Sequence, residues 1–151
     1  QGELALEYAK RISAIGIQAA ALRHHKRAPH PKAPLAINPA DLTRILGMLD
    51  KQLTKGQRDI VDEVIERLAQ PKPLNGLLSG DVGTGKTLTF LIPAIAAHLA
   101  GARVAIITPR TLLADQIANE LLRWDGLAKV ERVSTGGRIN DPTAILVSTT
   151  G

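Results

Sequence analysis

The sequence predicts an α/β fold, a parallel β-sheet with helices on both faces, preceded by an N-terminal helical segment. From residue 74 onward, short runs rich in Val, Ile and Leu alternate with stretches long enough to form helices. The run at 103–108 is β-rich and apolar, as expected for a central parallel strand. Hydrophobic residues make up 44% of the 151-residue chain, which is enough for the core of one such domain.

The N-terminal segment is predicted to be an appendage, residues 1–36, to a main domain over 37–151. Apolar residues at three- and four-residue spacing predict one amphipathic helix over 3–22, and the three prolines within 28–34 predict an extended linker. Residues 1–36 hold six Lys and Arg against two Glu, with the basic excess centred on 23–27. Such a cluster fits either contact with nucleic-acid phosphates or a solubilising linker.

The main domain is expected to begin with two helices. Asn38 followed by Pro39 is typical of a helix start, so a first helix is predicted over 38–50. Thr54 with Gln57 three residues later is a capping box, and it predicts a second helix that ends before the next proline.

Strands and helices then alternate. Strands are predicted at 74–79, 103–108, 129–134 and 144–148, with helices at 86–100 and 111–124. Since the strands are parallel, ligands are expected at their carboxyl ends.

The segment between the first of these strands and its helix carries the most specific motif. Residues 80–87 read Gly-Asp-Val-Gly-Thr-Gly-Lys-Thr, a complete G-x-x-x-x-G-K-[ST] pattern. In such a loop the backbone N–H groups turn inward onto a phosphate, and the helix N-terminus adds partial positive charge. Lys86 would reach the β- and γ-phosphates, and the Thr87 hydroxyl would bind Mg²⁺. The pattern predicts a nucleotide-binding protein rather than a glycine-rich turn before an ordinary buried helix.

The predicted nucleotide-binding residues include the whole loop. They are Gln57, Gly80, Asp81, Val82, Gly83, Thr84, Gly85, Lys86 and Thr87. Gln57 is included because its amide offers both a donor and an acceptor, as an adenine sensor requires. This role is compatible with its role in the capping box.

Small hydroxyl residues follow the other three strands. The predicted nucleic-acid contacts there are Thr108, Pro109, Arg110, Thr135, Gly136, Ser148 and Thr149. Hydroxyls, free backbone amides and a guanidinium suit a phosphate backbone, although each segment alone would also suit a tight turn.

Composition excludes several classes of site. The chain has no cysteine, and His24, His25 and His30 lack the spacing and the accompanying ligands of a zinc site. Trp124 closes a predicted helix, which favours packing over base stacking. We expect no signal peptide and no membrane-spanning helix, and therefore a cytoplasmic protein with no membrane partner.

Five motifs in order resemble the first RecA-like domain of superfamily 2 helicases, which has a P-loop NTPase fold. They lie at 53–57, 80–87, 108–116, 135–137 and 147–150. Within that superfamily the chain is most similar to the RecG family, which remodels branched DNA, and to its Mfd relatives. The loop sequence Gly-Asp-Val-Gly and the approach to it over 53–71 carry this narrower resemblance.

The resemblance implies an enzyme, an ATP-dependent DNA helicase or translocase of DNA repair and recombination, with ATP and Mg²⁺ as cofactors. It implies that Gln57 reads adenine, that Lys86 and Thr87 are the catalytic residues of this segment, and that the hydroxyl-bearing turns follow one DNA strand. Another superfamily 2 DNA or RNA helicase, a non-catalytic nucleic-acid-binding domain and a small-molecule kinase stay open as alternatives.

The resemblance also sets expectations about the rest of the motor. The Mg²⁺-binding carboxylates and the arginine finger of a second RecA-like domain would lie beyond residue 151, so the fragment alone is expected to bind nucleotide weakly and hydrolyse almost none. Two departures from RecG are visible: Pro-Arg-Thr replaces the usual Pro-Thr-Glu at 109–111, and the segment 137–146 is shorter, without a usual helix.

Overall fold

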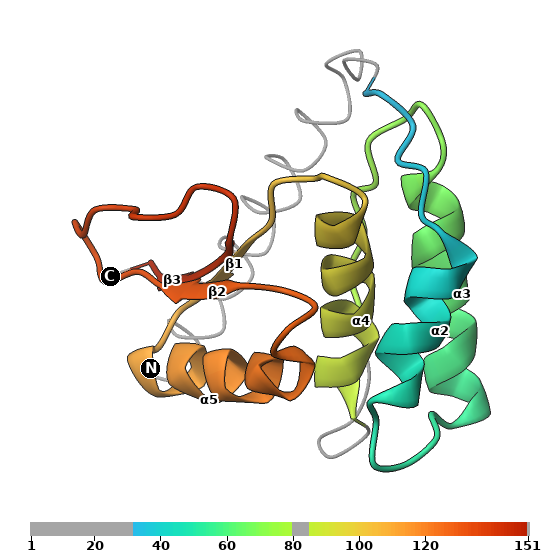
Figure 1. Ribbon diagram of the computed structural model, residues 1–151, viewed down its shortest axis with the longest axis horizontal. Helices are drawn as coiled ribbons and strands as arrows, with labels where there is room; N and C mark the ends of the chain where they lie inside the picture. Colours follow the sequence, from blue (N-terminus) through green and yellow to red (C-terminus); the bar gives the residue numbers. More distant parts are fainter. Residues whose placement is uncertain (1–31, 80–84, 151) are drawn as a thin grey trace, which may run out of the picture. The chain divides into compact units, whose positions relative to one another are not determined.

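The computed structural model describes residues 32–79 and 85–150. The predicted N-terminal helix, the basic cluster and the loop residues 80–84 lie outside this part of the chain. The elements in order are α2 (Pro39–Gly47), α3 (Lys55–Leu68), α4 (Lys86–Leu99), β1 (Ala105–Thr108), α5 (Thr111–Leu121), the 3₁₀ helix η1 (Leu122–Trp124), β2 (Val130–Arg132) and β3 (Ile145–Thr149) (Figure 1).

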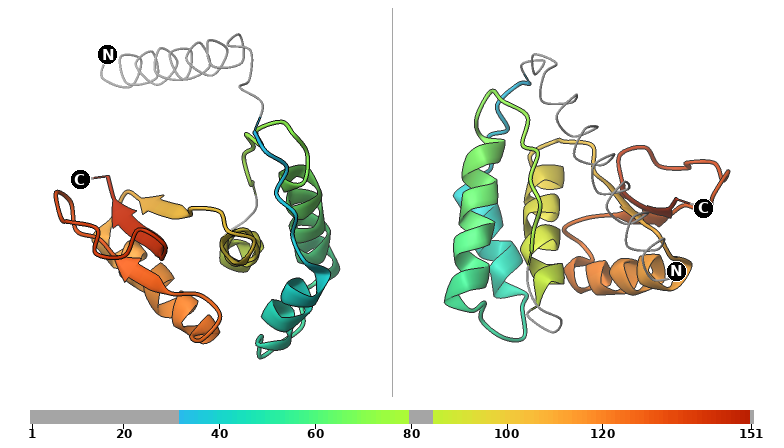
Figure 2. Two further views of the ribbon diagram at one scale, coloured as in Figure 1. Left: turned by 45° about the horizontal axis from the view of Figure 1, so that its top comes forward. Right: turned by 180° about the vertical axis from the view of Figure 1, so that it is seen from behind.

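The sheet is parallel, and β3 lies in its centre. The strand order is β1-β3-β2, with Thr108 opposite Thr149 and Arg132 opposite Val147. Helix α5 contacts all three strands and runs along one face of the sheet, as two further views also show (Figure 2). The parallel α/β sheet predicted from the sequence is therefore confirmed, and the carboxyl ends of its strands meet at one edge.

The predicted strand at 74–79 is wrong: the described residues of this segment form no strand. Its apolar side chains are not enclosed, and Leu77 is 94% exposed. A strand requires a partner that binds its N–H and C=O groups, whereas β1, β2 and β3 pair only among themselves in the described residues. The run Asn75-Gly76 also has low strand propensity, so a short apolar run was an insufficient signal.

Both predicted helix starts are confirmed in atomic detail. The Asn38 side chain accepts a hydrogen bond of 2.9 Å from the N–H of Ala40, two residues into the start of α2. At α3 the capping box is complete, because Thr54 Oγ1 accepts from Gln57 N at 3.3 Å and Gln57 Oε1 accepts from Thr54 N at 2.9 Å. These side chains satisfy N–H groups that the first helical turn leaves without a partner.

One apolar core joins the helices to the sheet. Helices α2 and α3 both pack on α4 (Figure 1), and the core extends from there to α5, η1 and β3. Its fully buried members include Ile45, Leu91, Ile95, Leu121, Trp124 and Ile145. The indole N–H of Trp124 donates a buried hydrogen bond of 3.0 Å to the carbonyl of Ile45, which links η1 to α2. The interpretation of Trp124 as a packing residue is thus confirmed.

Replacing this indole tests how strongly the two halves of the core depend on it. We expect Trp124→Phe to lower the free energy of unfolding by about 2 to 3 kcal/mol, since a buried hydrogen bond contributes about 1 kcal/mol and the smaller ring leaves a cavity. Urea unfolding measures the change. The control is Leu122→Ala, which truncates a side chain that is 59% exposed and should change stability far less. Equal losses in the two variants would contradict the role of Trp124.

The Glu131 carboxylate of β2 ties the far part of the long β2–β3 connection to the sheet. Glu131 accepts hydrogen bonds from Asn140 N at 2.8 Å, Asn140 Nδ2 at 2.9 Å and Asp141 N at 2.7 Å. The backbone N–H groups of Asn140 and Asp141 lower the pKa of Glu131 below its usual value. The pKa of Asp141 is lowered too, chiefly by the Thr143 hydroxyl and then by the Thr143 N–H.

These lowered pKa values predict acid sensitivity. A carboxylate whose pKa is lower in the folded state contributes stability that is present above its unfolded pKa of about 4 and is lost as pH falls through the folded value. We expect the urea midpoint to fall between neutral pH and pH of about 3, and to fall less in Glu131→Gln, which has no carboxylate at this position. The exposed Glu66 of α3 supplies the control, Glu66→Gln. An unchanged acid limb in Glu131→Gln would contradict the prediction.

Candidate functional site

The start of α4 is suited to bind an anion. Its N-cap is Gly85, in the left-handed conformation with φ of 71°, and glycine has no side chain to cap the first N–H groups of the helix. The N-terminal N–H groups of this 14-residue helix therefore lie where the loop pattern predicts the phosphate. Lys86 and Thr87 are the first two helical residues, and Thr87 is exposed.

Gln57 lies directly beside this helix start. Its Nε2 donates a long hydrogen bond of 3.4 Å to the carbonyl of Gly85, although the two residues are 28 positions apart. A Cβ atom added to Gly85 would lie 2.1 Å from the same nitrogen, so only glycine leaves room for the side chain as it stands. The structure thus brings two of the predicted nucleotide-binding residues together. The same Gln57 side chain completes the α3 capping box, so one amide serves both elements.

The residues at this helix start fit a nucleotide phosphate. They offer backbone N–H groups and an ammonium group, which bind phosphate oxygens, and a hydroxyl oxygen, which can bind Mg²⁺. In the described part of the chain, no group of three or more His, Cys, Asp or Glu side chains could hold a metal. The Thr87 hydroxyl is the Mg²⁺ ligand that the loop pattern predicts.

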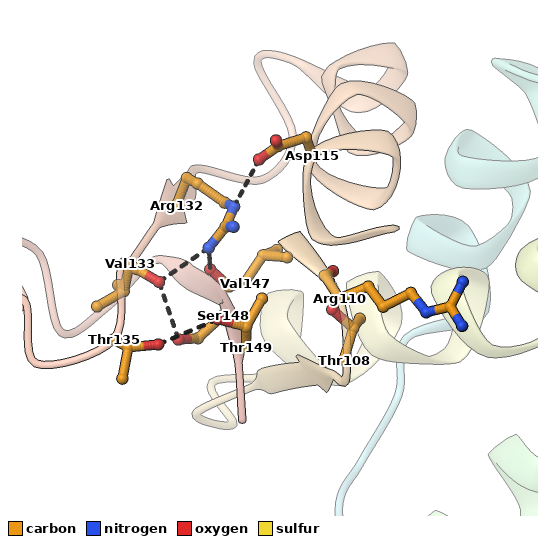
Figure 3. A network of polar contacts seen from close by, with 9 residues as sticks. All are labelled: Thr108, Arg110, Asp115, Arg132, Val133, Thr135, Val147, Ser148 and Thr149. Atoms are coloured by element: carbon orange, nitrogen blue, oxygen red, sulfur yellow. Dashed lines mark hydrogen bonds and ion pairs between the residues drawn. The ribbon is translucent and has the colours of Figure 1, made fainter. Parts of the chain in front are cut away.

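The hydroxyl-bearing turns lie at the carboxyl edge of the sheet. Thr108 and Thr149 are opposite each other in the β1–β3 register, and Thr150 N donates to Thr108 O at 3.0 Å. From the turn after β2, Thr135 Oγ1 lies 3.2 Å from Thr149 Oγ1, within hydrogen-bond distance (Figure 3). Three segments predicted separately from the sequence therefore meet.

Not every predicted hydroxyl has a hydrogen to offer a ligand. Thr108 is only 4% exposed and donates to Arg110 O at 3.0 Å, and Ser148 Oγ donates to Val133 O at 2.8 Å. Thr135 and Thr149 share one hydrogen bond between two hydroxyls, which leaves one hydroxyl hydrogen for a phosphate oxygen.

The other predicted contacts are placed around these hydroxyls. Pro109 and Arg110 are exposed, and the Arg110 side chain points away from Thr135 and Thr149 (Figure 3). Gly136 has φ of 73°, and the turn it belongs to is closed by a 2.8 Å hydrogen bond from Gly137 N to Ser134 O. The edge thus presents Arg110 on one side and the Thr135–Thr149 pair on the other.

Two residues that the sequence reasoning missed hold this edge together. Arg132, the last residue of β2, donates from Nε to Asp115 Oδ1 of α5 at 2.9 Å and from Nη1 to the carbonyl of Val133 at 2.9 Å (Figure 3). The available signal was an arginine at the end of a predicted parallel strand, where a partly buried charged group requires a partner.

A family model of DEAD/DEAH box helicases matches residues 54–151. The chain belongs to the DEAD/DEAH box helicase family. Among curated relatives, the ATP-dependent DNA helicase RecG of Escherichia coli O157:H7 is 35% identical over 116 residues, which are 77% of this chain and 16% of RecG. RecG of Borreliella burgdorferi is 41% identical over 75 residues, which are 50% of this chain and 11% of RecG. The chain thus spans less than a fifth of the length of these relatives.

A solved structure supports the same assignment of the fold. RecG bound to a three-way DNA junction aligns with a TM-score of 0.69 at 21% identity, covering 85% of this chain and 19% of RecG. The predicted similarity to superfamily 2 helicases and RecG is confirmed, as is the predicted class of RecA-like α/β fold.

Alanine substitutions at Gly85 and at Gly56 should change the stability of the protein in opposite directions. We expect Gly85→Ala to lower the free energy of unfolding by roughly 1 to 2 kcal/mol, because an L-residue is strained at positive φ. In the control Gly56→Ala, the new Cβ meets nothing within 4 Å in the first turn of α3, so stability should rise by roughly 0.5 to 1 kcal/mol.

Two effects destabilise Gly85→Ala: the strain of an L-residue at positive φ and the clash of the new Cβ with Gln57 Nε2. Urea unfolding in two backgrounds separates them. In a Gln57→Ala background the clash with Nε2 is absent and only the strain at positive φ is left. A stabilising Gly85→Ala would contradict the left-handed cap.

Proposed function

We propose that this chain is the nucleotide-binding segment of an ATP-dependent DNA helicase or translocase of the RecG type, acting on branched DNA. The observation that carries the proposal is the pairing of a P-loop helix start with a hydroxyl-lined strand edge in one DEAD/DEAH helicase domain. The similar curated proteins are named ATP-dependent DNA helicases, and the similar solved RecG is bound to a three-way DNA junction.

In this proposal Mg-ATP binds at the start of α4. Lys86 would neutralise charge on the β- and γ-phosphates, and the backbone N–H groups after Gly85 would bind phosphate oxygens. Thr87 would contribute its hydroxyl to Mg²⁺. Gln57 would present its amide to adenine while linking the helix start at Gly85 to the start of α3. When bound, Mg²⁺ would neutralise phosphate charge during transfer of the terminal phosphoryl group to water.

DNA would bind by its backbone at the carboxyl edge of the sheet. Arg110, Thr135 and Thr149 would contact phosphates, together with the backbone amides of the turns at Gly136 and after Thr108. Phosphate contacts position a strand without reading its sequence, which suits a motor that must move over any sequence. The Pro109–Thr111 turn carries the positive charge of this edge in Arg110.

A second RecA-like domain of the full-length protein would supply the arginines that stabilise the transition state. A cytoplasmic location is part of the proposal, because the proposed substrate is DNA. In the described residues, no helix combines the length and the apolar character needed to cross a bilayer.

The decisive test is ATP turnover by the full-length protein with no nucleic acid, single-stranded DNA, structured RNA or a forked duplex. We expect the fork to stimulate turnover most and Lys86→Ala to abolish the stimulation. In the 151-residue chain, Lys86→Ala should weaken binding of a fluorescent Mg-ATP analogue by roughly tenfold or more, as loss of a charge-assisted hydrogen bond implies.

The matched control is Lys51→Ala, which removes an exposed ammonium group between α2 and α3. Stimulation by RNA or single strands would favour another superfamily 2 helicase over a branched-DNA enzyme. Turnover that no nucleic acid stimulates would contradict the helicase proposal and favour a kinase or other phosphotransferase.

A further inference from the structure

We propose that Arg132 and Asp115 act as a positioning pair that fixes the Thr135 and Thr149 hydroxyls for DNA backbone binding. The inference rests on the proposed function, because it concerns the same strand edge. It adds two residues that would govern DNA affinity without touching DNA.

A single guanidinium connects three elements at this edge. Arg132 ends β2, its Nε donates to Asp115 on α5 at 2.9 Å, and its Nη1 donates to Val133 O at 2.9 Å and to Val147 O of β3 at 3.3 Å (Figure 3). The Arg132 side chain is 26% exposed, so most of it is enclosed by these partners. The planar fork of arginine makes such a three-way connection possible, whereas a lysine ammonium group on a flexible stem would not hold the same directions.

The two carbonyls that Arg132 binds lie next to the proposed phosphate contacts. Val133 is two residues before Thr135, and Val147 is two residues before Thr149. Val133 O also accepts from Ser148 Oγ at 2.8 Å, and Val133 N donates to Val147 O at 2.9 Å. These bonds set the spacing between the two chain segments, and the 3.2 Å contact between the Thr135 and Thr149 hydroxyls depends on that spacing.

The charge at this place argues for positioning rather than direct phosphate binding. The Arg132 guanidinium is already matched by the Asp115 carboxylate, which is 53% exposed near the strand ends. An exposed carboxylate repels DNA, so its electrostatic effect alone would weaken binding. If Asp115 nevertheless increases affinity, it must do so by holding Arg132 and the turns in place. Direct binding and positioning therefore predict opposite signs for the removal of this carboxylate.

The experiment is a fluorescence anisotropy titration of the 151-residue chain with a labelled single strand and a labelled forked duplex at low salt. We expect Asp115→Asn to weaken DNA binding about three- to tenfold, which lies within the range of couplings between neighbouring groups, although it makes the protein more positive. Arg132→Lys keeps the charge and should weaken binding to a similar extent. Binding that is unchanged or tighter in Asp115→Asn would overturn the inference.

A matched control uses a second arginine–aspartate ion pair, which lies on α3. Arg58 Nε donates to Asp62 at 2.9 Å on the surface of α3, so Asp62→Asn removes the same charge from a comparable pair away from the strand ends. It should leave DNA affinity unchanged or slightly raise it. Binding of the Mg-ATP analogue should be the same in Asp115→Asn and the parent chain, which shows that the variant is folded.

A double-mutant cycle with Thr149→Ala separates positioning from general destabilisation. If Arg132 and Asp115 act through the hydroxyl pair, Asp115→Asn should have little further effect once Thr149→Ala has removed that pair. Full additivity of the two losses would overturn the inference. If Thr149→Ala weakens DNA binding and Asp115→Asn does not, the positioning pair alone is wrong. If the parent chain binds no DNA, the proposed interface and this inference both fail.

Discussion

The parallel pairing of β3 with a strand on each side is the constraint on which the proposed interface depends. Since β1, β3 and β2 run in the same direction, their carboxyl ends must share one edge, whatever the length of the connections between them. Residues far apart in the sequence, such as Thr108, Thr135 and Thr149, thereby become neighbours. The pairing is stabilised from below by α5, which contacts all three strands and contributes Ile117 and Leu121 to the core.

The parts of this arrangement that follow from local chemistry could be predicted from the sequence. The caps at Asn38 and Thr54 depend on residues within one turn, and the strand-ending hydroxyl segments follow from the alternation of apolar runs and helices. The strand at 74–79 could not be judged in this way, because an apolar run does not reveal whether a partner strand is available. The exposed side chain of Leu77 shows that this apolar run is not enclosed. Whether such a run forms a strand depends on a neighbouring strand to pair with and not on its composition alone.

The residues of the candidate site also differ in how far they could be predicted from the sequence. The loop pattern predicts Gly85, Lys86 and Thr87 as phosphate-binding residues from sequence alone, since the spacing itself expresses the backbone geometry. The Arg132–Asp115 pair joins residues 17 positions apart on different elements, and no periodic pattern encodes such a contact. Likewise the sequence could not say that Thr108 and Ser148 have committed their hydroxyl hydrogens to backbone carbonyls.

The distribution of hydrogen bonds at the edge also bears on how a translocating protein can hold a strand and release it. Two hydroxyls that share a hydrogen bond can exchange donor and acceptor roles at little cost, so in the proposed interface the Thr135–Thr149 pair would receive a phosphate oxygen and give it up again. A pair of exposed cations would bind more strongly but with a steeper dependence on salt. The positive charge of Arg132 is instead neutralised by Asp115 and directed at carbonyls, so it contributes geometry rather than attraction. The proposed interface, with its placed hydroxyls and one guanidinium of Arg110, would thus make contacts that are weak individually and depend on the relative positions of three strands.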